Sequence, residues 1–116
     1  MDILVTSSTI TLSWLKTIRD DIEKKFSHTI KYKESKYWAS FQNTRTNRNV
    51  ASLQPQKSQI RLLLRLIPSY YYHLKESPCS GGWAKHYPSI FVVKSENMIK
   101  KAVELIISSY EYDLKI

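Results

Sequence analysis

The segment that decides the fold is KSQIRLLLRL, from Lys57 to Leu66. Side chains of a β-strand point alternately to opposite faces of a sheet. Every second residue from Ile60 onward is aliphatic, after Ser58 at the start of that series, whereas the other series contains Lys57, Arg61 and Arg65. The segment therefore predicts a long strand with one face for a core and one basic face. The basic face has two interpretations: contact with an anionic partner, or simple solvation that also discourages edge pairing.

Two segments that flank the centre of the chain have helical rather than alternating periodicity. Apolar residues follow one another at steps of three and four between Leu12 and Phe26, which predicts a helix there. A second helix is expected after Ser95, with Glu96 in its first turn and an end near Ser109–Glu111. Its apolar stripe comprises Met98, Ile99, Ala102, Val103, Leu105, Ile106 and Tyr110.

Between the helices, alternation predicts four further strands, at residues 29–34, 36–42, 50–54 and 89–94. The segment 67–88 contains three of the four prolines and both glycines, and we expect an ordered loop there. The predicted fold class is α+β: a single domain over residues 1–116, with an antiparallel sheet of about five strands. Both helices are expected to pack on one face of that sheet.

The charge of the chain is concentrated in its middle. The net charge is +8, but the segment from Lys24 to Lys94 holds thirteen basic and only two acidic residues, a net charge of +11. Such an asymmetry bears on partners rather than on fold, and it favours an anionic partner such as DNA or RNA.

Six basic residues are the candidate phosphate contacts of this segment: Lys36, Arg45, Arg48, Lys57, Arg61 and Arg65. Alternate residues of a strand are roughly 6–7 Å apart, which is close to the phosphate spacing along one nucleic-acid strand. Lysine supplies a point charge there, and arginine can hold a phosphate through two hydrogen bonds.

Aromatic residues lie among these basic residues and suggest a stacking or pocket site. Trp38 and the run Tyr70–Tyr72 are the candidates for exposed rings on which bases stack. Tyr71, Tyr72, Trp83 and His86 are the candidate pocket residues. The alternative is that the rings are core. We expect this of Tyr32, Tyr37, Phe41 and Phe91, and we expect Trp83 to fix its loop onto the sheet.

Several classes of chemistry lack the residues they need. No His, Cys, Asp or Glu group has metal-ligand spacing, and no glycine-rich phosphate loop exists. The three histidines have few acidic partners nearby, and Cys79 has no obvious activating base. We therefore expect no catalytic residues, no metal and no cofactor. The amino terminus does not resemble a signal peptide and no apolar run spans a membrane, so a soluble cytoplasmic protein without membrane contact is expected.

Four segments, in the same order, resemble a small domain family of unknown function that has been labelled a predicted transport-protein domain. They are SKYWASF (Ser35–Phe41), LQPQKSQIRLLLRL (Leu53–Leu66), GGW (Gly81–Trp83) and KSENMIKKAVELIISSYE (Lys94–Glu111). The resemblance covers roughly residues 30–111, but Gly82 stands where the family usually has histidine. Such domains are often found beside restriction-type or other DNA-processing nuclease domains, which implies an accessory role related to nucleic acid.

The function expected from the sequence is non-catalytic binding of nucleic acid through a basic sheet face and neighbouring aromatic rings. Two alternatives remain open. One is a protein-interaction module that serves a nuclease or a defence system, which would expose an apolar patch. The other is a small-ligand pocket behind the aromatic loop, which would require a cavity near Trp83 and Tyr71. The sequence does not decide the oligomeric state.

Overall fold

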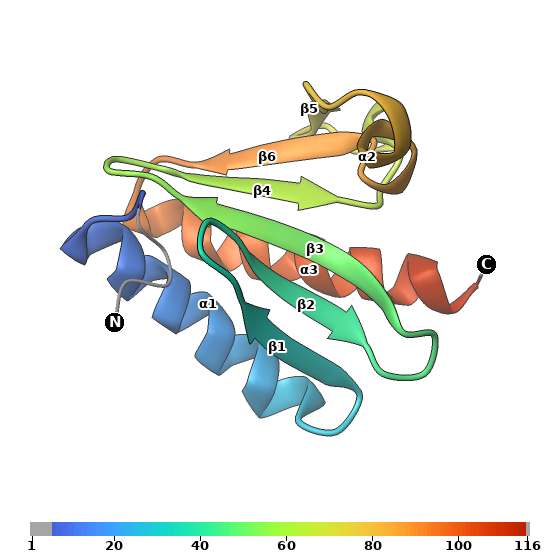
Figure 1. Ribbon diagram of the computed structural model, residues 1–116, viewed down its shortest axis with the longest axis horizontal. Coiled ribbons are helices and arrows are strands. Elements are labelled where there is room, and N and C mark those ends of the chain that lie inside the picture. The colour runs from blue at the N-terminus through green and yellow to red at the C-terminus, as the bar shows by residue number, and fades with distance from the viewer. Residues whose placement is uncertain (1–5, 116) are drawn as a thin grey trace.

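The computed structural model describes residues 6–115, which form a six-stranded antiparallel sheet with helices (Figure 1). In chain order the elements are α1 (Thr9–Phe26), β1 (Ile30–Glu34), β2 (Ala39–Asn43), β3 (Arg48–Pro55), β4 (Ile60–Leu64), the 3-10 turn η1 (Pro68–Tyr70), β5 (Lys75–Glu76), α2 (Gly81–His86), β6 (Ser89–Val93), the 3-10 turn η2 (Glu96–Met98) and α3 (Ile99–Leu114). The strand order is β1-β2-β3-β4-β6-β5. The predicted α+β class is confirmed, with the two-residue strand β5 added to the expected five.

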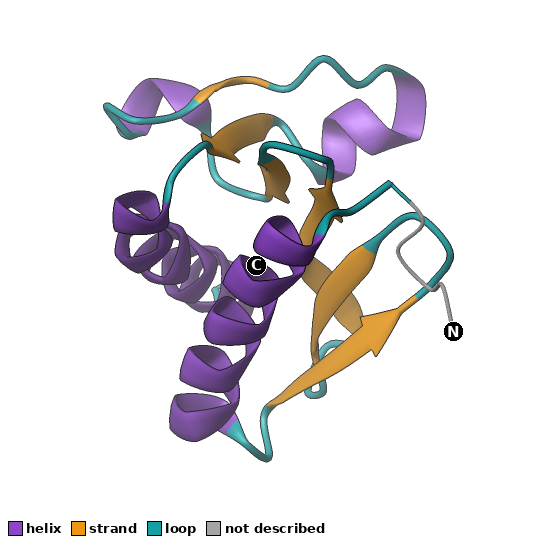
Figure 2. Ribbon diagram, turned by 90° about the vertical axis from the view of Figure 1, so that its left-hand side faces the viewer, coloured by secondary structure: helices purple, strands orange, loops and turns teal. Residues whose placement is uncertain are grey.

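Both long helices lie on one side of the sheet, as predicted (Figure 2). Ser8 caps α1: its hydroxyl accepts a hydrogen bond from the Thr11 backbone, and the Thr11 side chain accepts one from the Ser8 backbone. The helix α3 continues to Leu114, about one turn beyond the predicted end. No helix among residues 6–115 is long and apolar enough to cross a membrane.

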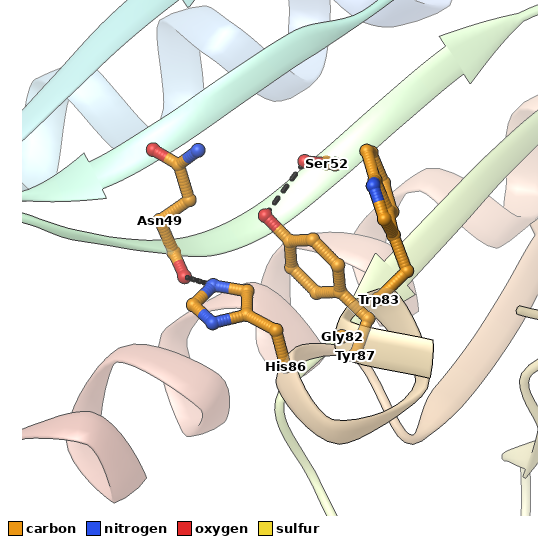
Figure 3. Close-up of a pocket in the computed structure, with 6 residues that line it drawn as sticks. All are labelled: Asn49, Ser52, Gly82, Trp83, His86 and Tyr87. Carbon is orange, nitrogen blue, oxygen red and sulfur yellow. Dashed lines mark hydrogen bonds between the residues drawn. The ribbon is translucent and has the colours of Figure 1, made fainter. Parts of the chain in front are cut away.

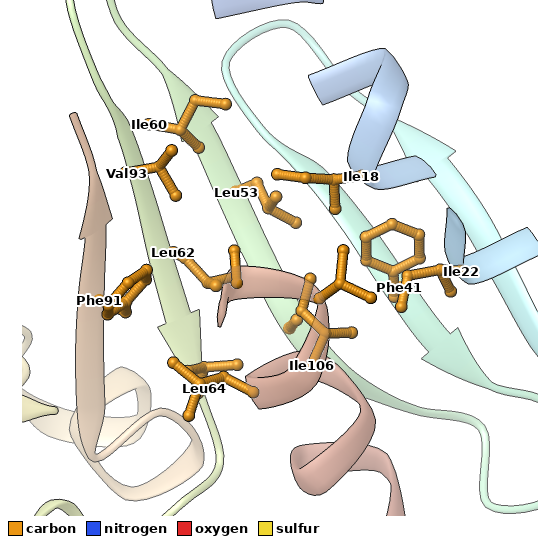
Figure 4. Close-up of a cluster of buried hydrophobic side chains, with 14 of the residues drawn as sticks. Ile18, Ile22, Phe41, Leu53, Ile60, Leu62, Leu64, Phe91, Val93 and Ile106 are labelled. Carbon is orange, nitrogen blue, oxygen red and sulfur yellow. The ribbon is translucent and has the colours of Figure 1, made fainter. Parts of the chain in front are cut away.

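The hydrophobic core fills the space between the sheet and the two helices (Figure 4). Ile18 and Ile22 enter it from α1, and Ile106 enters it from α3. The strands contribute Phe41, Leu53 and the aliphatic series Ile60, Leu62 and Leu64, all without solvent exposure. The aliphatic series of the opening segment therefore faces the helices, as the alternation predicted.

The opening segment forms a shorter strand than the alternation predicted. Lys57 lies in the β3–β4 turn, which is closed by a hydrogen bond from the Gln56 amide to the Gln59 carbonyl. Arg65 follows the end of β4, because its amide donates to the Ser109 hydroxyl of α3 instead of to a neighbouring strand. Lys57, Arg61 and Arg65 therefore do not share one strand face; only Arg61 lies within β4.

An irregularity in the β2–β3 pairing fixes which residues of β3 face away from the helices. The register shifts between Phe41 and Gln42, so that Phe41 is opposite Ala51 but Gln42 is opposite Asn49. The strand thus buries Val50 and Ala51 in the core and places Asn49 and Ser52 on the opposite face of the sheet. We call this opposite face the outer face.

One aromatic prediction is wrong. Tyr37 was expected in the core but is 45% exposed, because β2 begins only at Ala39 and Tyr37 lies in the preceding turn. The ammonium group of Lys36 lies 5.6 Å from the Tyr37 ring centroid, within the range of a cation–π contact. Phe41 and Phe91 are buried as predicted, and Tyr32 is partly buried against the core.

Candidate nucleic-acid interface

The outer face of the sheet is polar and basic over strands β1 to β4. Lys31 and Lys33 of β1 lie opposite Gln42 and Ser40 of β2. The next strands add Ser52 and Gln54 from β3 and Arg61 from β4, which is opposite Gln54. The Arg61 guanidinium also donates to the Gln54 side-chain oxygen at 3.3 Å. Cations of β1 and β4 are thus separated by three strand spacings, roughly 14–15 Å.

Two tryptophans from distant parts of the chain meet over this face. Trp38 directly precedes β2, and Trp83 lies in α2. Their ring centroids are 5.6 Å apart at an angle of 45°, and Trp83 is also 5.6 Å from Tyr87. Tyr87 is buried whereas Trp83 is 50% exposed. The three rings form an aromatic wall with an exposed central member.

Two adjoining hollows lie against this wall. The first, of about 260 Å³, is bounded by Asn49, Ser52, Trp83, His86 and Tyr87, together with Gly82 (Figure 3). The second, of about 410 Å³, shares Asn49, Ser52 and Trp83 with the first and extends to Lys33, Glu34, Ser35, Trp38 and Ser40. We call the two together the tryptophan groove. Its floor is the β2–β3 part of the outer face.

Two hydrogen bonds attach α2 and the residue after it to this floor (Figure 3). The Tyr87 hydroxyl lies 2.7 Å from the Ser52 hydroxyl, and the His86 imidazole bonds to the Asn49 carbonyl at 2.8 Å. Burial raises the pKa of Tyr87, although hydrogen bonds from the Ser52 and Asn49 side chains counteract the rise. Tyr87 is therefore a neutral hydroxyl that fixes the position of Trp83.

His86 is held in a defined neutral form by its two partners. A carbonyl oxygen can only accept and a guanidinium can only donate. His86 Nε2 therefore donates to the Asn49 carbonyl, and Nδ1 accepts from Arg65 Nη1 at 2.8 Å. Burial lowers the pKa of His86, and the positive charge of Arg65 lowers it further. The neutral imidazole links the groove to a charged cluster beneath it.

This arrangement predicts a pH dependence of stability. Because the pKa of His86 is lower in the folded protein than its ordinary value of about 6.5, the unfolded chain binds more protons below that pH. The free energy of unfolding should therefore be highest above pH 6.5 and decrease as the pH falls below 6.5 toward the depressed pKa of His86. Urea unfolding of wild type, His86→Gln and the exposed control His73→Gln should show a smaller decrease only in His86→Gln. An equal decrease in all three would contradict the assignment.

The charged cluster is centred on Asp113 of α3, which has no solvent exposure. Its carboxylate accepts hydrogen bonds from Asn43 Nδ2 at 3.0 Å, from the Thr46 hydroxyl at 2.6 Å and from Arg48 Nε at 2.7 Å. Arg65 Nε is 3.7 Å away. Burial alone would raise the pKa of Asp113, but these hydrogen bonds and the charge of Arg48 lower it below its ordinary value. Asp113 is therefore an anion that orders two arginines.

The six basic residues singled out from the sequence are distributed over several sites. Lys36, Arg45 and Lys57 are exposed in three different turns, and Arg61 lies on the outer face. Arg48 and Arg65 are engaged with Asp113. The structure does not bring the six together on one surface.

The structure also brings only some of the candidate aromatic and pocket residues together. Trp38, Trp83 and His86 meet at the tryptophan groove. Tyr71 instead packs against the hydrophobic core, and Tyr72 is 96% exposed. Neither Tyr71 nor Tyr72 lines the groove.

The interface also depends on residues that were not among the predicted site residues, chiefly Lys31, Lys33, Asn49, Ser52 and Tyr87. The sequence did contain a signal for the two lysines, because the segment IKYKE (Ile30–Glu34) alternates between core-facing and charged residues. Asn49 and Ser52 had none, because the bulge that turns Asn49 to the outer face depends on pairing with a distant strand.

No family model, curated protein or solved structure matches the chain. Within residues 6–115, no group of three or more His, Cys, Asp or Glu side chains is placed to hold a metal ion.

Proposed function

We propose that this protein binds nucleic acid without catalysis, using the outer face of the sheet. The observation that carries the proposal is the position of Lys31, Lys33 and Arg61 on a sheet face that also carries the tryptophan groove. Cations hold the sugar-phosphate backbone, and neighbouring rings offer surfaces to bases. The exposed Lys36, in the β1–β2 turn, extends the charged surface beside Trp38.

Arg48 and Arg65 have a supporting part in this proposal. Both contact Asp113, and Arg65 also orients His86 at the end of the groove. Their charges are partly balanced by that carboxylate, so they contribute less to a phosphate contact than the freely exposed lysines. We assign them to holding α2 and the β2–β3 turn in place.

The proposal predicts a salt-dependent affinity that depends on the position of the charges. With three or four phosphate contacts, log K for a single-stranded oligonucleotide should fall against log salt with a slope of roughly −2 to −3. The double variant Lys31→Glu/Lys33→Glu should lose most of this binding and reduce the slope. Fluorescence anisotropy with a labelled decamer over a salt series measures both quantities.

The matched control is Lys24→Glu/Lys25→Glu, which makes the same change in charge in the last turn of α1. These lysines are on the helix side, and the control should retain most of the affinity if the outer face is the interface. Equal losses in both double variants would indicate only non-specific attraction to a basic protein. Absence of binding at low salt by the wild-type protein would refute the proposed function.

A further inference from the structure

The most unusual feature of the outer face is that a tryptophan from α2 is held in place and left half exposed. Trp83 touches Trp38 and Tyr87, and Tyr87 is anchored to Ser52. A hydrophobic ring that served only the core would be covered more completely. Here three elements of the chain fix a flat apolar surface beside a hollow. Such a surface is what a planar ligand requires.

The size of the hollow limits what this ligand can be. Pockets for drug-sized molecules usually measure about 300–1,000 Å³. The open hollow lined by Asn49, Ser52, Trp83, His86 and Tyr87 measures about 260 Å³. It therefore suits one planar ring system, and the adjoining 410 Å³ hollow leaves room for what is attached to that ring.

The floor of the hollow offers hydrogen-bonding groups of both kinds. Asn49 lines the hollow, and its amide oxygen Oδ1 has almost no solvent-accessible surface and no hydrogen-bond partner, so a bound base reaches this oxygen only after the side chain turns. A buried acceptor without a partner costs about 1–3 kcal/mol, so its presence calls for an explanation. Ser52 and Tyr87 share one hydrogen bond, which leaves one of their two hydroxyl hydrogens available. The edge of a nucleobase presents donors and acceptors side by side and matches such a floor.

Charge near the hollow indicates what is attached to the ring. Lys33 lines the wider part of the groove beside Glu34, whose carboxylate accepts a hydrogen bond from the Tyr32 hydroxyl, and Lys31 is two residues from Lys33 on the same face of β1. Alternate residues of a strand are roughly 6–7 Å apart, about the phosphate spacing of an extended strand. A base against Trp83 would thus bring its phosphate backbone toward β1. A base inside a duplex has both faces stacked and its pairing edge occupied, so it cannot enter.

From this geometry we propose that the groove binds single-stranded nucleic acid and holds one unpaired base against Trp83, with its edge at Asn49. This inference rests on the proposed nucleic-acid function and specifies its substrate class. Asn49 acts through its amide alone, because its backbone carbonyl is the group that anchors His86. Asparagine pairs with adenine through two hydrogen bonds, so adenine is the base chosen for the test.

The test compares three labelled probes at constant low salt: a deoxyadenosine decamer, an abasic decamer with the same backbone, and a ten-base-pair duplex. Stacking of one base contributes about 1–3 kcal/mol, so the wild-type protein should bind the adenine decamer at least about fivefold tighter than the abasic one. The duplex should bind no better than the abasic decamer. Trp83→Ala should remove the preference and leave abasic binding unchanged, and Trp83→Phe should restore part of it.

Two further variants separate recognition from folding. Asn49→Ala should weaken binding of the adenine decamer about fivefold, since one amide contact is lost. Because the Asn49 side chain also hydrogen-bonds Tyr87, thermal melting of the variant and its unchanged affinity for the abasic decamer show that the loss is one of recognition. Tyr72→Ala removes an exposed ring that does not line the groove and should leave the affinity for all three probes unchanged. If the adenine and abasic decamers bind equally, the groove proposal is overturned while the proposed function stands. If no probe binds, both are refuted.

Discussion

Replacement of Asp113 by alanine is expected to lower the free energy of unfolding by about 3–5 kcal/mol, the largest effect of any single polar substitution considered for this protein. The carboxylate has no solvent exposure and accepts hydrogen bonds from three side chains, and Arg65 lies within ion-pair distance. Its removal would leave the arginines without their counter-charge. Arg65 would be affected most, because its side chain is only 13% exposed. Urea denaturation at pH 7 measures the loss.

The matched control for this prediction is Glu111→Ala on the same helix. Glu111 is exposed, so its loss should change stability by no more than about 0.5 kcal/mol. Asp113→Asn keeps the shape but not the charge and should fall between the two. A loss below about 1 kcal/mol for Asp113→Ala would contradict the prediction that the cluster stabilises the fold.

Acid should act on the same cluster at a pH well below the His86 transition. The pKa of Asp113 is lowered in the folded protein, so its contribution is complete above its ordinary value near 4 and is lost as the pH falls toward the depressed value. The wild-type protein should therefore lose stability in two separate ranges, one below pH 6.5 and one below pH 4. In Asp113→Asn this residue no longer titrates, so the loss of stability below pH 4 should be smaller than in the wild-type protein.

Much of the fold could be predicted from the periodicity of apolar residues, because this periodicity indicates which side of a helix or strand is buried. The stripe of α1 and the aliphatic series of β4 were both predicted, and they meet in one core. The end of α3 was missed for an instructive reason. Asp113 continues the helical spacing from Ile106 and Tyr110, but a charged residue on an apolar stripe resembles the start of a tail. Its partners are distant in the sequence, so nothing local marks it as buried.

The candidate site was less predictable because it depends on contacts between remote segments. Trp38 and Trp83 were each singled out from the sequence, but their meeting depends on the packing of a six-residue helix that is too short to show periodicity. The predicted row of Lys57, Arg61 and Arg65 failed at both ends, since turn closure and the Ser109 hydroxyl end the strand. Alternation identifies a face but does not determine where a strand stops.

The second large effect is expected from the opening segment itself. Leu62 lies in the middle of β4, opposite Leu53 and Phe91, and has no solvent exposure. Leu62→Ala should lower the free energy of unfolding by about 2–5 kcal/mol, because it removes buried methyl groups and leaves a cavity between the sheet and α3. We expect a value in the upper part of this range. The strands next to β4 are fixed by backbone hydrogen bonds on both sides, so the neighbouring side chains cannot easily move into the cavity.

The control for Leu62 is Leu12→Ala, the same chemical change at a residue that is 43% exposed on α1. It should change stability by less than about 1 kcal/mol, since leucine and alanine are both good helix formers and little apolar surface is uncovered. Chemical denaturation should give equal m-values and well-separated midpoints for the two variants. Similar losses in both would contradict the packing of β4 against the helices. Leu62 points away from the outer face. The fraction of Leu62→Ala protein that is folded should therefore bind the adenine decamer with wild-type affinity. This result would show experimentally that the aliphatic face of β4 serves stability and its basic face serves binding.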